Sequence, residues 1–159
     1  MVPGATGAGN PAPNCVASTP PAPPSASAPC VKGAGTPWTT LGGQAKVNLA
    51  NGQFQFNVKG LVLGGGNNIG QVPSTITAVF PTFVCISTTG AGNSLNTTAV
   101  TIVGASVPLS ASGDAQTSDT ITLDGTCKTA MNVAFLIGIN GRNGFAWVAN
   151  GSVRTSSAN

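Results

Sequence analysis

Apolar and polar residues alternate along much of the chain beyond residue 40, and this pattern is typical of β-strands. Val47 and Leu49 alternate with polar residues in one segment, and Phe54, Phe56 and Val58 do so in the next. Side chains two positions apart lie on the same face of a strand, so each segment offers one face to a core. An Asn-Gly pair separates the two segments and predicts that they form a hairpin.

The alternation continues to residue 149 and predicts further strands. We expect them over residues 75–80, 82–86, 99–103, 106–109, 120–123, 131–139 and 145–149. The inward-facing positions of the last three are Ile121, Leu123, Met131, Val133, Phe135, Ile137, Ile139, Phe145, Trp147 and Ala149. Pro81 interrupts a long strand and requires a sheet edge or a bulge, because proline donates no ladder hydrogen bond. Asn-Gly pairs at 140–141, 143–144 and 150–151 predict three more turns.

Seven to nine strands at this spacing, with no convincing helical period in any window, predict an all-β fold. The expected architecture is an antiparallel β-sandwich, Ig-like or jelly-roll-like. We assign it to residues 38–159 as one domain.

The first 37 residues lack this alternation. Nine of the twelve prolines lie there, at Pro3, Pro11, Pro13, Pro20, Pro21, Pro23, Pro24, Pro29 and Pro37. Proline fixes φ and has no amide donor, so polyproline II or disorder is the natural state of such a segment. Residues 1–37 therefore form a Pro/Ala/Gly/Ser-rich extended tail in this interpretation. A flexible linker, a mucin-like stalk and a segment docked on a sandwich are all consistent with it.

The tail also offers a means of assembly. Its less proline-dense portions, Val2–Asn10 and Val31–Thr40, can pair with a strand of a neighbouring molecule. Head-to-tail donation is a heterologous contact, which builds open filaments when the rotation does not close. The candidate assembly residues are Val2, Pro3, Val16, Val31, Pro37 and Trp38.

Charge is sparse. Charged residues are 6% of the chain, where about 25% is usual. The six cations, Lys32, Lys46, Lys59, Lys128, Arg142 and Arg154, are scattered. Nucleic-acid binding needs a clustered basic face, so we do not expect it. A near-neutral surface gives little colloidal repulsion and permits association.

The cysteines favour an oxidising compartment. Cys15, Cys30, Cys85 and Cys127 are widely spaced without a C-x-x-C motif, which speaks against a zinc or redox site. Of three pairings we favour Cys15–Cys30 with Cys85–Cys127, and the alternatives are four free thiols or an intermolecular role for Cys15 or Cys30. We expect a secreted protein, extracellular or at the cell surface. The N-terminal residues lack signal-peptide features, so we presume that the signal has been removed. No stretch approaches the ~18 apolar residues of a membrane span.

Catalytic chemistry is poorly represented. The chain has no His and no Glu, so it has no Ser-His or Cys-His nucleophile system and no His-ligated metal site. Its three acids, Asp114, Asp119 and Asp124, lie in one short segment. We interpret Asp114 and Asp124 as turn residues rather than calcium ligands or a glycosidase pair. We expect no catalytic residue, metal or cofactor, and no enzyme.

A few side chains are candidates for other roles. Trp38 and Trp147 are the candidate ligand platform, although core packing for Trp147 and anchoring of the tail for Trp38 are the favoured interpretations. Asn96 and Asn150 stand in glycosylation sequons.

The order of several motifs resembles a group of uncharacterised secreted bacterial proteins. A strand ends at Cys85, Pro-Leu-Ser-x-x-Gly-Asp-Ala follows at 108–115, and then come Cys127 and Gly-Arg-x-x-x-x-Trp at 141–147. The resemblance covers residues 55–154. It implies a β-sandwich with Cys85 and Cys127 bridged, and it implies no activity.

Two functional hypotheses follow. The first is a non-enzymatic secreted structural protein, a self-assembling protomer of an extracellular filament or surface layer linked through its N-terminal tail. Its partner is a homo-oligomer or polymer of itself. The alternative is a monomeric adhesin or glycan-binding module on a Pro-rich stalk, with a glycan or a host surface as partner.

Overall fold

The computed structural model describes residues 2–3, 16–17, 30–89, 96–123, 125–129, 132–141, 144–152 and 154–156. Its strands are β1 (Val2–Pro3), β2 (Val16–Ala17), β3 (Cys30–Gly33), β4 (Trp38–Thr39), β5 (Gly42–Asn48), β6 (Gln53–Lys59), β7 (Val62–Leu63), β8 (Ala78–Thr89), β9 (Asn96–Val103), β10 (Val107–Pro108), β11 (Ala115–Thr120), β12 (Asn132–Gly141), β13 (Gly144–Ser152) and β14 (Arg154–Ser156). The helix α1 (Gly125–Thr129) has five residues. Over the described ranges, the structure contains no helix long and apolar enough to cross a membrane.

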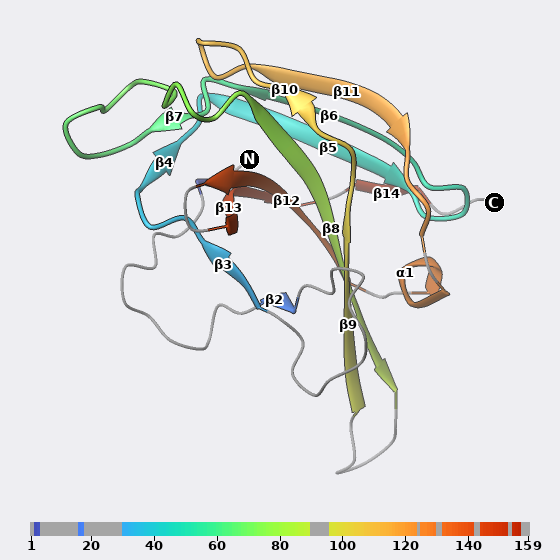
Figure 1. Ribbon diagram of the computed structural model, residues 1–159. Coiled ribbons are helices and arrows are strands. Elements are labelled where there is room, and N and C mark those ends of the chain that lie inside the picture. Colours follow the sequence, from blue (N-terminus) through green and yellow to red (C-terminus); the bar gives the residue numbers. More distant parts are fainter. Residues whose placement is uncertain are drawn as a thin grey trace.

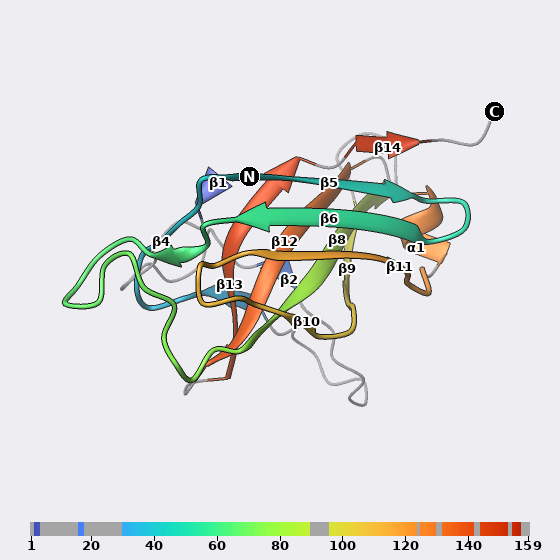
Figure 2. The same ribbon diagram turned by 90° about the horizontal axis from the view of Figure 1, so that it is seen from above.

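Two large sheets stack as a β-sandwich, which confirms the predicted fold class. The first sheet has the order β10-β8-β12-β13-β3-β2, with β9 also on β8 and β1 also on β13. The second has the order β11-β6-β5-β14, and β4 and β7 form a small pair of their own. Figures 1 and 2 show the second sheet lying across one face of the first. Most strand pairs are antiparallel, and the β13–β3 and β14–β5 pairs are parallel.

Aromatic rings join the two sheets in the main core. Phe54 and Phe56 of β6 face Phe83 of β8 and Phe135 of β12. The ring centroids of Phe54 and Phe83, and of Phe83 and Phe135, are 5.3 Å apart. The centroids of Phe56 and Phe135 are 5.4 Å apart. Such tilted and edge-to-face contacts add to the stabilisation that burial of the rings provides.

The inward positions predicted for β12 are confirmed where the structure describes them. Phe135, Ile137 and Ile139 are buried in the main core, and Val133 is half-buried against it. Met131 lies outside the described residues. Strand period 2 therefore accounts for the inner face of this strand, and Leu136 is buried on its other face.

The Asn51-Gly52 hairpin signal is also confirmed. Gly52 follows the turn between β5 and β6 with a φ of 74°, and its amide donates to the Asn48 carbonyl oxygen at 2.8 Å. A Cβ on Gly52 would lie 2.0 Å from the Ile121 carbonyl oxygen, so glycine is required there.

Two sequence predictions about strand limits are wrong. Asn150 and Gly151 do not form a turn, because β13 continues through them and pairs them with Leu136 and Phe135 of β12. The predicted strand 120–123 is also displaced. β11 ends at Thr120, and Ile121 follows the strand yet still lies in the core. The apolar alternation marks burial correctly, and pairing with β6 sets the strand limits.

Pro81 lies within β8, at a point where the neighbouring strand is interrupted. It lies opposite Ile137 of β12, and its carbonyl oxygen accepts a hydrogen bond from the Gly104 amide at 2.7 Å. The nitrogen and oxygen of one residue point to the same side of an antiparallel strand. The missing N–H of Pro81 therefore faces the β9–β10 side, where pairing with β8 stops at Val103 and resumes at Val107. No hydrogen bond to β12 is lost.

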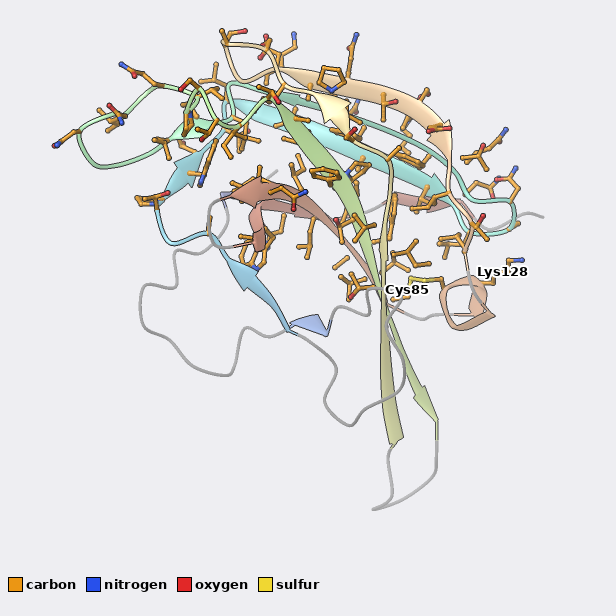
Figure 3. All side chains as sticks on the ribbon, in the orientation of Figure 1. Cys85 and Lys128 are labelled. Carbon is orange, nitrogen blue, oxygen red and sulfur yellow. A yellow bond between two sulfur atoms is a disulfide. The ribbon has the colours of Figure 1, made fainter. Side chains whose placement is uncertain are left out.

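The predicted Cys85–Cys127 disulfide is present. Both cysteines are fully buried, and their bond fastens α1 to β8 (Figure 3). A disulfide of this kind fits an oxidising compartment. The predicted Cys15–Cys30 bond lies outside the described residues and side chains.

Candidate functional site

The outer edge of β13 is the part of the sandwich on which the N-terminal region docks. β12 pairs along one edge of β13. On the other edge, β1 pairs antiparallel with β13 and places Val2 opposite Asn150 and Pro3 opposite Ala149. This contact is only two residues long.

β3 occupies the same edge of β13 beside β1. β3 and β13 are parallel, with Lys32 opposite Ala146 and Gly33 opposite Trp147. The Ala34 amide donates to the Trp147 carbonyl oxygen at 3.0 Å and extends this ladder. Two segments that are far apart in the sequence therefore complete one sheet edge.

From the β13 edge, β3 and β2 lead across the outer face of the first sheet, which is the face directed away from the second sheet. β2 pairs antiparallel with β3, with Val16 opposite Val31, and β2 also lies beside β9. Since β9 and β13 lie on opposite sides of β8 and β12, this path crosses the outer face (Figure 1).

A second apolar cluster lies on that outer face. Val84 of β8, Leu136 of β12 and Trp147 of β13 pack together, and Ala134 lies against them. Val84 is fully buried, and Leu136 and Trp147 are 4% and 7% exposed. The outer face of a sandwich sheet ordinarily faces water, so burial of this kind requires a cover. β3 and β2 lie on the side of the first sheet that carries this cluster.

Two threonines on the same face are buried with this cluster. Thr82 of β8 is opposite Leu136, and Thr101 of β9 is opposite Val84. Both are almost completely shielded from solvent. The Thr82 hydroxyl donates to the Phe80 carbonyl oxygen at 3.3 Å, so its polar group is satisfied within its own strand.

A β-bulge in β13 turns Trp147 toward this second cluster. Ile137 lies opposite Ala149 and Gly138 opposite Trp147, so Val148 is the extra residue. A bulge shifts the alternation of side chains by one position. Ala149 therefore faces the main core while Trp147 faces the outer cluster. Trp147 is buried as predicted, but the prediction that it shares the face of Ala149 is wrong.

Trp38 is buried at the start of the sandwich. Its side chain is 4% exposed and belongs to the main core, and Trp38 lies opposite Leu63 of β7. The Pro37 carbonyl oxygen accepts a hydrogen bond from the Gly64 amide at 2.8 Å. This arrangement fixes the point where the N-terminal region joins the sandwich. A ligand platform at Trp38 and Trp147, as the sequence predicted, requires rings that are exposed to solvent. Both rings are buried.

Asp114 has a structural role in the turn before β11. Its Oδ1 accepts a hydrogen bond from the Gly60 amide at 2.9 Å, and its Oδ2 accepts one from the Ser112 hydroxyl at 3.1 Å. The Asp114 amide in turn donates to Ser110 Oγ at 2.9 Å. These bonds attach the turn to the end of β6, as expected of a turn aspartate.

Gly113 closes the same turn against the link between β6 and β7. Its φ is 80°, and its carbonyl oxygen accepts a hydrogen bond from the Leu61 amide at 2.8 Å. A Cβ on Gly113 would lie within 2.4–2.7 Å of three Leu61 backbone atoms. The Gly-Asp pair of the Pro-Leu-Ser-x-x-Gly-Asp-Ala motif therefore has a packing explanation.

Of the other two acids, the structure describes Asp119. Asp119 lies on β11, where its Oδ1 accepts a hydrogen bond from the Thr120 amide at 2.7 Å. Asp124 lies outside the described residues. Over the side chains that the structure places, no three metal-ligating groups come together.

The outer face of the second sheet carries a row of amide side chains. Gln44, Asn57 and Gln116 lie side by side on β5, β6 and β11. Lys46, Gln55 and Ser118 form the next row. Both rows line a shallow groove of about 370 Å³. Sequence reasoning did not single out these residues, because alternate polar positions are ordinary for a solvent-facing strand.

Comparison of the chain with family models, curated proteins and solved structures finds no match.

Proposed function

We propose that the chain is a non-enzymatic, secreted structural protein that assembles through its N-terminal tail into an extracellular filament or surface layer. The observation that carries this proposal is the outer edge of β13. Chain segments of two and four residues complete that edge. Main-chain hydrogen bonds of this kind form equally well with a segment from another molecule.

The contrast in strand length supports the proposal. β8, β12 and β13 have between nine and twelve residues and pair along most of their length. The pairs of β1 and β3 with β13 involve two residues each. Short pairings open at low free-energy cost, and a segment that opens readily can exchange.

The charge and composition of the chain support it as well. The net charge is +3, with three acids in 159 residues. Few charges guard the sheet edges against pairing with other molecules, and electrostatic repulsion between copies is weak. The absence of His and Glu from the sequence argues against most acid–base chemistry.

The proposal is tested by electron microscopy of the refolded full-length protein at micromolar concentration. The matched control is the same protein without residues 1–37. We expect ordered filaments or sheets from the full chain only, and a folded, dispersed domain from the shortened chain. Dispersed particles from both proteins contradict the proposal.

A second candidate function is glycan binding, which the amide groove on the second sheet favours. Side-chain amides donate and accept hydrogen bonds at once, as do the hydroxyl groups of sugars. The groove residues Gln55 and Gln116 carry no charge, and the groove is open to solvent. A glycan array tests this function with the unaltered chain and with the double variant Gln55→Ala and Gln116→Ala. Binding that the double variant loses supports it, and a silent array rejects it.

A further inference from the structure

We infer that the contact between copies is a strand exchange, in which β3 of one molecule pairs with β13 of the next and covers its second apolar cluster. This inference rests on the proposed function and specifies its interface. The strand donor is the segment before Gly35 of one molecule. The strand acceptor is the outer edge of β13 in the next molecule, together with Val84, Leu136 and Trp147.

The acceptor is built to receive a strand from outside the sandwich. The β13 edge offers the Trp147 carbonyl oxygen and its neighbours as hydrogen-bond partners. The cluster beside it is apolar and nearly inaccessible to solvent while the N-terminal region is in place. Loss of that region would expose Trp147 and Leu136 to water, at a cost proportional to the exposed apolar area. The acceptor therefore favours an occupied state, whichever molecule supplies the strand.

The donor is joined to the sandwich by a hinge. The Ala34 amide is bound to Trp147, and the Pro37 carbonyl oxygen is bound to the Gly64 amide. Only Gly35 and Thr36 lie between these two fixed points, where the chain bends and is exposed. A residue that precedes proline favours an extended conformation, so Thr36 works against the bend. A Cβ added to Gly35 would meet nothing within 4 Å, so the hinge has room to open.

Opening of this hinge moves β3 together with β2. β2 is paired with β3, and β1 occupies the same edge of β13. The pairings that form on a second copy are those that were released, so exchange loses no contact. An extended residue spans about 3.3–3.6 Å, so a two-residue hinge keeps the neighbouring sandwich close to Trp38. The assembly is therefore closely packed rather than a string of separated domains.

Cysteine pairs distinguish exchange from docking within one molecule. Lys32 and Ala146 lie opposite each other in the β3–β13 pair. Full-length Lys32→Cys and Ala146→Cys variants are mixed in equal amounts, refolded together, assembled, oxidised and separated on a non-reducing gel. Each copy donates once and accepts once, so about one interface in four carries both cysteines. We expect a disulfide-linked pair of the two variants at that level.

Three controls accompany the mixture. The chain without either substitution reports exchange among the native cysteines. A mixture of Lys32→Cys with Lys46→Cys places the second cysteine on the outer face of the other sheet, where no link to residue 32 is expected. The double variant Lys32→Cys and Ala146→Cys in a single chain reports whether β3 and β13 pair at all.

The outcomes separate the interface from the function. Assemblies with the expected mixed disulfide support strand exchange. Assemblies without it, in which the double variant links within single chains, overturn strand exchange and leave the assembly function intact. Assemblies in which the double variant forms no link also overturn it, because β3 then does not pair with β13. Failure of the unaltered chain to assemble overturns the proposed function and the exchange with it.

Discussion

The two faces of the first sheet are built from the same strands and covered in different ways. On the inner face, Phe83 and Phe135 pack against Phe54 and Phe56, which come from a seven-residue strand held between two others. On the outer face, Val84, Leu136 and Trp147 form a smaller cluster. On that side lie β2 and β3, which have two and four residues.

Under the proposed function, this difference separates folding of the sandwich from the contact between copies. The inner face is enclosed by a sheet that pairs along its whole length within the chain, so its burial accompanies folding of the sandwich. The outer face depends on a segment that one hinge connects to the rest. A cover of that kind can come from the same molecule or from its neighbour, and in the main core the choice changes which molecule supplies Ala34.

Truncation of one aromatic side chain on each face sharpens this comparison most strongly. Phe135→Ala removes a fully buried ring, so we expect the free energy of unfolding to fall by about 3–5 kcal/mol. The loss should be the same in the full chain and in the chain without residues 1–37. In the full chain, Trp147→Ala should lower the free energy of unfolding by less than Phe135→Ala does. In the shortened chain the loss should be smaller again, because residues 1–37 no longer pack against Trp147. Urea unfolding of the four variants measures these differences, and equal losses for Trp147→Ala in both chains contradict the account.

Removal of the disulfide tests the inner face in another way. In the loop-entropy model, a bridge between residues 42 apart stabilises by about 4 kcal/mol. We expect the double variant Cys85→Ala and Cys127→Ala to lose an amount of this order in urea unfolding at fixed protein concentration. If it still folds, it should assemble as the unaltered chain does, because Cys85 belongs to the main core and not to the outer cluster. Loss of assembly with the fold retained would break the separation of the two faces.

Gly113 tests the closure of the second sheet over the inner face. Gly113→Ala introduces a Cβ against the Leu61 backbone and strains a positive φ, so we expect a loss of about 2–3 kcal/mol. The matched control is Gly66→Ala, at a φ of 81° with nothing within 4 Å. It carries the backbone strain alone and should cost about 1 kcal/mol. Similar losses for the two variants in thermal unfolding would show that the contact with Leu61 is unimportant.

Asp114 gives the smallest expected effect. Asp114→Ala removes the acceptor of the Gly60 amide, and an unpaired, partly buried donor of this kind costs about 1–2 kcal/mol. Asp114→Asn keeps an acceptor oxygen and should recover most of that loss. Added calcium should stabilise neither variant nor the unaltered chain. A rise in the melting temperature with calcium in the unaltered chain alone would point instead to a metal site at Asp114.

Local pattern is enough to predict the inner face. Period-2 alternation identifies Phe54, Phe56 and Phe135 as core residues, and the Asn51-Gly52 pair identifies the hairpin. Each signal is contained in a few consecutive residues, and a sandwich buries such strand faces whatever its exact topology.

The outer face is harder to predict, because alternation reports only one buried face of a strand. The segment from Val133 to Ile139 has almost no polar residue, and such a continuous apolar run is typical of a strand buried on both faces. Alternation places Trp147 with Ala149, because nothing local marks the bulge at Val148. The docking of β1 and β3 on β13 joins residues more than a hundred positions apart, which periodicity cannot detect.

The central claim is that residues before Trp38 cover the outer cluster, while the inner core, to which they contribute Ala34, stays folded without them. Fluorescence of Trp147 tests it most directly, because the chain has two tryptophans and no tyrosine. Trp38→Phe leaves Trp147 as the single reporter, in the full chain and in the chain without residues 1–37. We expect Trp147 emission to shift to longer wavelength and to become accessible to acrylamide in the shortened chain, while β-sheet circular dichroism and cooperative unfolding persist. A Trp147 that stays equally shielded in the shortened, folded chain would contradict the account.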